Sequence, residues 1–94
     1  MFDLPIEKAK ILKQKTEDFK TKLNQEFITH SSSDKSIEIK ISILGNIKEI
    51  NTTASVDITH IIPLLNEAIN EAKSIYEIRL AEMYQQEMKN LWNG

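Results

Sequence analysis

The sequence predicts a single α+β domain with the element order α-β-β-β-α. Isoleucines at every second position of residues 36–44 indicate a strand with one apolar face, and Gly45-Asn46 directly after it indicates a chain reversal. Patterns with the three- and four-residue spacing of amphipathic helices lie on both sides of this region. We therefore expect a three-stranded antiparallel sheet, an N-terminal helix and a long C-terminal helix in one domain of residues 1–94.

Residues 4–24 carry the pattern of the N-terminal helix. Apolar or small residues recur at spacings of three and four, which places them on one side of a helix: Pro5, Ala9, Leu12, Thr16, Phe19 and Leu23. Pro5 suits the first turn, where no backbone donor is needed, and Asp3 is the expected N-cap.

Three strands are expected at residues 26–30, 36–44 and 47–53. The middle strand is the clearest, because its isoleucines alternate with serine, glutamate and lysine. A turn rich in serine at residues 31–34 connects the first two strands, and Gly45-Asn46 forms the hairpin before the third. One face of this sheet is apolar, so the helices can cover it.

A second helix is expected at residues 59–91. Asp57 or Thr59 is its expected cap, and Pro63 should fall within its first turn or so, because a proline farther in would kink the helix. Such a helix is roughly 45 Å long. Together with the isoleucine ladder of the sheet it presents more apolar surface than one small chain can bury, which predicts a homodimer. The contact could join sheet edges or paired helices.

Composition narrows the class of function. The chain has a net charge of -2, no cysteine and no run of 18 apolar residues, and residues 1–10 lack the apolar run of a signal peptide. We therefore expect a cytoplasmic protein without a membrane partner. His30 and His60 belong to no set at metal-ligand spacing, and no catalytic motif or phosphate-binding loop is present. No enzyme activity, cofactor, metal or small-molecule substrate is expected.

Three segments carry a resemblance to a known family. Met1-Phe2-Asp3 before a lysine-rich helix, the hairpin Gly45–Asn51 and the helix segment Leu64–Ala72 resemble the YbaB/EbfC family of nucleoid-associated proteins over nearly the whole chain. The chain departs from the family at Ser31-Ser32-Ser33, where members usually carry a glycine-rich loop, and at Pro63, where an acidic residue is usual. The segment after the third strand is also two or three residues short.

The resemblance implies a bacterial, cytoplasmic homodimer with helices that project like tweezers and that binds duplex DNA in the nucleoid. Contact would be mainly with backbone phosphates, which favours a positively charged surface. Residues 1–25 hold six lysines against four acids, whereas the rest of the chain leans acidic. The candidate DNA-binding residues are Lys8, Lys15 and Lys22 on one flank of the first helix, Lys13 and Lys20 on the other, and Arg79.

Each of these candidates has an alternative interpretation. The lysines could simply solvate the helix and pair with acids three or four residues away. Arg79 falls on the apolar face of the second helix, so an acid should meet it unless that part of the helix leaves the core.

The candidate core or dimer-interface residues are Ile39, Ile41, Leu65, Ile69, Ala72 and Tyr76. The alternative function is a homodimeric scaffold or adaptor that binds a protein partner through its projecting helices, without binding DNA.

Overall fold

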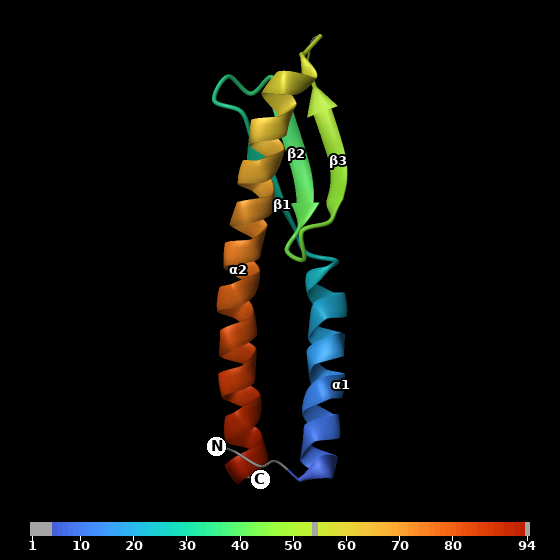
Figure 1. Cartoon of the computed structure of the whole chain (residues 1–94), viewed down its shortest axis with the longest axis vertical. Helices are drawn as coiled ribbons and strands as arrows, with labels where there is room; N and C mark the ends of the chain where they lie inside the picture. The colour runs from blue at the N-terminus through green and yellow to red at the C-terminus, as the bar shows by residue number, and fades with distance from the viewer. Residues whose placement is uncertain (1–4, 54, 94) are drawn as a thin grey trace.

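The computed structural model describes residues 5–53 and 55–93 and has the predicted element order. Helix α1 (Ile6–Leu23) leads into the strands β1 (Phe27–Ser31), β2 (Ile37–Ser42) and β3 (Ile47–Thr52), and helix α2 (Ile58–Asn93) follows. Figure 1 shows the sheet packed beside the first half of α2, with α1 beside the second half. The fold is therefore α+β, as predicted.

The sheet is antiparallel throughout, with the strand order β1-β2-β3. Its register places Ile39 between His30 of β1 and Ile50 of β3, and Ile41 between Ile28 and Ile47. Directly paired residues point to the same face of a sheet. One face of all three strands is therefore rich in isoleucine, and the polar residues of β2 point to the other.

Helix α2 covers only part of this apolar face. It packs against β1 and β2, where Ile37, Ile39 and Ile41 are buried. The opposing buried residues of α2 are Leu64, Ala68 and Ala72. Two of the three are alanines, so the helix backbone can approach the sheet closely. All six residues of β3 stay exposed, because they lie outside the strip that the helix covers.

The turn between β2 and β3 begins earlier than the sequence indicated. β2 ends at Ser42, and the Gly45 N–H donates to the Ser42 carbonyl at 2.8 Å, so Ile43 and Leu44 belong to the turn. Gly45 has a φ of +90°, which glycine adopts without strain. The fully buried Ser42 hydroxyl donates to Asn24 Oδ1 and accepts from the Asn46 N–H. These bonds tie the hairpin to the end of α1.

The serine-rich loop before β2 is held by Asp34. This carboxylate accepts from the Ser32 hydroxyl at 2.8 Å, the Ser36 hydroxyl at 2.7 Å and the Ser36 N–H at 3.0 Å. The bonds from the Ser36 backbone, the Ser36 side chain and Ser32 lower the pKa of Asp34 to about 2. The predicted turn is therefore present, and a carboxylate rather than a glycine sequence organises it.

The structure shows where both helices begin and decides between the two caps predicted for α2. Asp57 precedes α2, and its carboxylate accepts from the Thr59 N–H at 3.2 Å, so Asp57 is the cap. Pro63 is the sixth residue of α2, slightly beyond the first turn, and the helix continues through it. α1 begins at Ile6, directly after Pro5, which makes no side-chain capping bond. Asp3 lies outside the described residues.

The molecule is long and thin. Its dimensions are 56 × 20 × 17 Å, and its radius of gyration is 17.9 Å. A compact chain of this length would have a radius of gyration of about 12 Å. The elongation arises because α1 and the second half of α2 lie side by side and extend beyond the sheet (Figure 1). This pair of helices, which the sheet separates in the sequence, is named here the helical hairpin.

We expect Ile39→Ala to lower the free energy of unfolding by roughly 2–5 kcal/mol, because it opens a cavity beneath α2. Ile78→Ala is the control, since Ile78 is 60% exposed on α2, and its cost should stay below about 1 kcal/mol. Urea denaturation of the two variants measures the difference. Equal costs would show that the core does not lie between β2 and α2.

Candidate functional site

The first flank of α1 borders α2, although Lys15 and Lys22 remain exposed. The Lys8 ammonium donates to the Leu91 carbonyl at 2.6 Å, and Lys15 forms an ion pair with Glu87 at 3.1 Å. Lys22 lies near the same side, beside a shallow pocket of about 370 Å³ that Lys15 and Glu87 also line. Two of the three predicted lysines of this row therefore hold the helical hairpin together.

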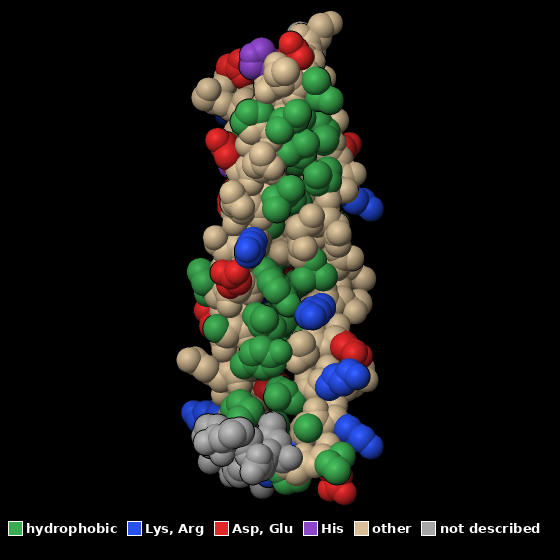
Figure 2. All heavy atoms as spheres, viewed as in Figure 1, with side chains coloured by type: hydrophobic (Ala, Val, Ile, Leu, Met, Phe, Trp, Pro, Cys, Tyr) green, Lys and Arg blue, Asp and Glu red, His purple; other side chains and the backbone are tan. Residues whose placement is uncertain are grey.

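The second flank of α1 is open to solvent. Lys13 and Lys20 are exposed there, and Lys10, which the sequence analysis did not single out, joins them at a spacing of three from Lys13. Within the described part of the chain, no carboxylate lies in ion-pair range of these three ammonium groups. Figure 2 shows basic side chains spaced along the α1 side of the hairpin. Lys10, Lys13 and Lys20 are named here the lysine row.

A pocket of about 400 Å³ lies next to the lysine row. Lys13 and Lys20 border it on α1, Tyr84 borders it on α2, and Glu17 contributes the acidic group among its lining residues. The pocket floor is formed by small or apolar side chains of α1: Ala9, Leu12 and Thr16. This surface combines cations at its edge with an aromatic side chain, and nothing in it resembles a catalytic arrangement.

Arg79 is paired within its own chain. Its Nη1 donates to Glu26 Oε2 at 3.0 Å, and both side chains are about one-third exposed. The acid that the sequence analysis required for Arg79 is therefore present, and it comes from the segment between α1 and β1. This bond connects the far half of α2 to the start of the sheet, so Arg79 has a structural partner rather than an open position for a phosphate.

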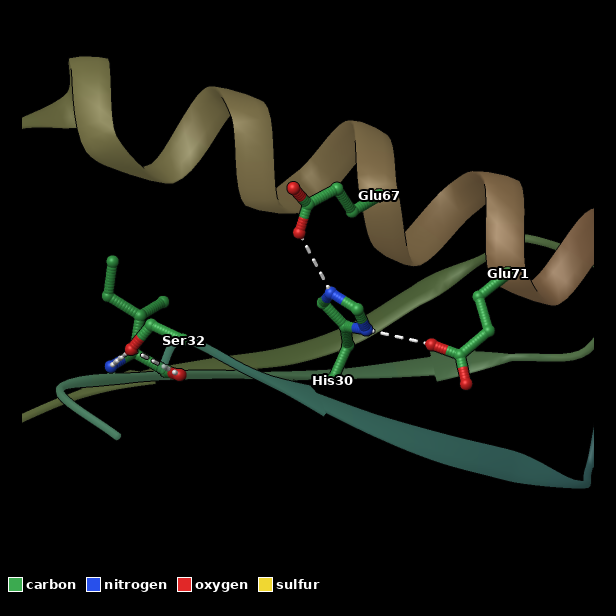
Figure 3. A network of polar contacts seen from close by, with 5 residues as sticks. His30, Ser32, Glu67 and Glu71 are labelled. Carbon is green, nitrogen blue, oxygen red and sulfur yellow. Dashed lines mark hydrogen bonds and ion pairs between the residues drawn. The ribbon is translucent and has the colours of Figure 1, made fainter. Parts of the chain in front are cut away.

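His30 forms a two-sided contact between β1 and α2 that the sequence analysis missed. Its Nδ1–H donates to Glu71 Oε2 at 2.7 Å, and its Nε2–H donates to Glu67 Oε2 at 3.2 Å (Figure 3). Ionised carboxylates only accept, so both bonds exist together only in the imidazolium form. The hydrogen bonds to Glu67 and then to Glu71 raise the pKa of His30. The four-residue spacing of Glu67 and Glu71 places both carboxylates on one face of a helix, and this was the sequence signal that could have indicated the contact.

Apolar side chains, exposed apart from the half-buried Leu65, run along the flank of α2 opposite the two glutamates. Ile58, Ile62, Leu65 and Ile69 recur at spacings of four, three and four, so they share one side of the helix. Ile47 and Ile50 of β3 adjoin them on the uncovered part of the sheet. Figure 2 shows hydrophobic side chains gathered along the molecule at this position. These six residues are named here the apolar band.

The predicted core or interface residues separate into two groups. Ile39, Ile41 and Ala72 are fully buried within one chain. Leu65 and Tyr76 are half-buried, and Ile69 is exposed. The first group therefore belongs to the core of the protomer, and only the second is available to a partner.

The outer face of the sheet carries a mixed set of charges. Lys40 and Lys48 place their ammonium groups 5.2 and 6.0 Å from the ring centre of Phe27. Lys40 lies directly opposite Glu49 in the register, so the cations of this face have acidic neighbours. This face therefore lacks the excess of positive charge that the lysine row has.

Residues 5–53 and 55–93 contain no cluster of three or more histidine or carboxylate side chains arranged to bind a metal. Over the same residues, neither helix combines the length and apolar character needed to cross a bilayer. The chain matches no family model, and no curated relative was found.

We expect the protein to lose stability as the pH rises above 6.5 and through the raised pKa of His30. The folded-state pKa of His30 lies above its ordinary value of 6.5, so the stabilisation from this contact is complete below pH 6.5 and disappears as the pH rises through the folded pKa. His30→Gln should flatten this dependence, because it removes the imidazole that bonds to Glu67 and Glu71. Urea midpoints across this range test it. Parallel curves for the two proteins would contradict the role of His30.

Proposed function

We propose that this protein is a homodimeric nucleoid-associated protein of the YbaB/EbfC type that binds duplex DNA mainly through backbone phosphates. The observation that carries the proposal is the lysine row. Lys10, Lys13 and Lys20 are exposed on the helical hairpin, and none has a carboxylate partner among the described residues. Cations without acidic partners can neutralise phosphates without first breaking an ion pair.

The dimensions of the lysine row suit a DNA backbone. Lys10 and Lys20 are ten residues apart on α1, which corresponds to about 15 Å along the helix axis. Successive phosphates of one strand are spaced about 3.4 Å apart along duplex DNA. The row can therefore follow a few phosphates of one strand. Such contacts position a protein on DNA and carry no sequence information, so we expect binding with little sequence preference.

The size of the exposed surface supports a homodimer. One chain of 10.9 kDa exposes 6815 Å². A compact monomer of the same mass would expose about 5,600 Å². The excess of about 1,200 Å² exceeds the roughly 800 Å² that each partner buries in a standard interface. Two copies would also double the lysine row, which strengthens phosphate binding.

A scaffold or adaptor is the second candidate function. Ile6 and Ile78 are 74% and 60% exposed on α1 and α2, away from the apolar band. Exposed isoleucines on a helical hairpin suit a protein partner better than a phosphate backbone. A pull-down that recovers one specific protein after nuclease treatment, without a measurable DNA complex, would favour this function over the first.

We expect Lys10→Glu/Lys13→Glu/Lys20→Glu to abolish DNA binding while the helix content stays the same. With three phosphates per protomer, the wild-type dimer should show a salt slope of about -5 in a plot of log K against log salt concentration. Binding of a labelled duplex at about 50 and 200 mM salt measures both quantities.

The control is Lys35→Glu/Lys40→Glu/Lys48→Glu, which makes the same change in net charge on the sheet and its loop. This variant should retain binding within a few-fold of wild type. Equal losses in the two triple variants would mean that only total charge matters. The absence of a wild-type complex at low salt and micromolar dimer would exclude DNA binding by this protein.

A further inference from the structure

We propose that the pocket beside the lysine row is a docking site for an acidic amphipathic helix of a partner protein, and that this helix and DNA exclude each other there. The pocket lies between Ala9, Leu12 and Thr16 of α1 and Tyr84 of α2 and is named here the hairpin pocket. The inference rests on the proposed function only for the competition with DNA, because the apolar part of the pocket is a separate observation.

The apolar part of the hairpin pocket has no role in the proposed DNA binding. Ala9, Leu12 and Thr16 recur at spacings of three and four, so they line one side of α1. Tyr84 is 38% exposed beside them, and Ile6, three residues before Ala9, is 74% exposed. A phosphate backbone meets lysines but has no apolar groups to fill such a pocket. Apolar side chains bordered by charged ones are instead typical of a surface that binds another protein.

The charges around the hairpin pocket favour an acidic partner. Lys13 and Lys20 border it, Lys10 lies three residues before Lys13, and Glu17 is the carboxylate among the lining residues. Three ammonium groups therefore surround one carboxylate. The pocket on the other flank of the helical hairpin is lined by four charged residues whose signs balance: Lys15, Lys22, Asp18 and Glu87. Of these two pockets, the hairpin pocket alone combines an apolar floor with an excess of positive charge.

The shape of this surface suits a helix. α1 and the second half of α2 lie side by side and run in opposite directions (Figure 1). A third helix can pack against both of them at the pocket, as in a helical bundle. An extended segment would gain less, because helices satisfy their backbone groups internally and offer no strand edge. The stems of Lys13 and Lys20 add apolar surface for such a partner, and their ammonium groups can meet its acidic side chains.

A second copy of this chain is a poorer occupant of the hairpin pocket. A two-fold contact brings the same surface of both copies together, so the lysine row of one protomer would lie against the lysine row of the other. Like charges that meet at an interface are unfavourable. An acidic helix removes this repulsion and still covers the apolar residues.

Fluorescence anisotropy with a designed peptide tests the docking. The labelled peptide repeats the heptad Leu-Glu-Ala-Leu-Leu-Ala-Glu about three times, which gives a helix of roughly 30 Å, similar in length to the 18 residues of α1. Its leucines share one side, and its glutamates flank them. We expect wild-type protein to bind this peptide at micromolar concentration.

Two control peptides separate the contributions of charge and apolar contact. One has lysine in place of each glutamate, and the other has the same composition in a scrambled order that removes the apolar stripe. Each should bind at least about tenfold more weakly, a difference of roughly 1.4 kcal/mol. Equal binding of the scrambled peptide would mean that charge alone attracts it, and equal binding of the lysine peptide would mean that the lysine row does not choose the partner. Either result would overturn the inference.

Tyr84→Ser separates the docking site from the proposed DNA binding, because it changes the pocket without changing the lysine row. We expect peptide affinity to fall about tenfold, as for an aromatic contact residue, and duplex affinity to stay within about twofold. Ile78→Ser is the matched control, since Ile78 is 60% exposed on α2 and does not line the pocket, and it should leave both affinities unchanged. Unchanged peptide binding by a folded Tyr84→Ser protein would contradict the inference.

A second pair of variants tests the α1 side of the pocket and does not depend on the folding of Tyr84→Ser. Ala9→Glu places a carboxylate beside the docked glutamates and should weaken peptide binding about tenfold. Gln14→Glu makes the same change of charge at an exposed position of α1 outside the pocket, and it should have little effect. Circular dichroism checks the helix content of every variant. Equal effects of Ala9→Glu and Gln14→Glu would overturn the inference.

Competition distinguishes the failure of this inference from the failure of the proposed function. Unlabelled acidic peptide should displace a labelled duplex from wild-type protein. Peptide binding without any DNA complex would exclude the proposed DNA binding and support the docking site. A DNA complex in a protein that does not bind the peptide would overturn this inference alone. If Tyr84→Ser lowers the molar mass of the protein in light scattering, a second copy occupies the pocket and the inference also fails.

Discussion

The packing of one helix on a three-stranded sheet is the constraint on which the rest of this structure depends. α2 buries Ile37, Ile39 and Ile41 by bringing two alanines against them, and this close contact supplies most of the core. A helix that sits so close to β1 and β2 cannot also cover β3. The exposed isoleucines of β3 and the stripe on α2 are therefore consequences of the same packing, and they account for the proposed association of two chains.

Polar contacts fix how α2 lies against the other elements. His30 bonds to Glu67 and Glu71 at the β1 edge, and Arg79 bonds to Glu26 where the sheet meets the helical hairpin. These groups are partly exposed, so each bond contributes modestly to stability. Their main effect is on orientation: with its glutamate flank turned to β1, α2 must present its isoleucine stripe on the β3 side. On α1, the ion pair with Glu87 likewise orients Lys15 toward α2, and Lys13 on the other flank faces outward.

The two ends of the molecule are suited to different tasks. The sheet end has the exposed isoleucines of β3 and of the neighbouring flank of α2, and such an apolar surface favours association between chains. The hairpin end has cations that have no acidic partner among the described residues, which favours contact with phosphates. This separation also explains why a chain with a net charge of -2 is compatible with DNA binding: what matters is the local charge on one flank of α1, and most of the acidic excess lies elsewhere in the chain.

The sequence by itself determined the element order, the apolar face of β2, the turn at Gly45 and a cap at Asp57 or Thr59, because each follows from the spacing or conformational preference of residues close together in the chain. The resemblance to YbaB/EbfC proteins also comes from the sequence, and it stays a proposal. Only the tertiary structure decided that Arg79 meets Glu26, that His30 bridges two glutamates, and that Lys8 and Lys15 are engaged while Lys10, Lys13 and Lys20 are open. Those pairings join residues far apart in the chain or depend on which flank of a helix faces its neighbour, and helical periodicity identifies a flank without saying what lies opposite it.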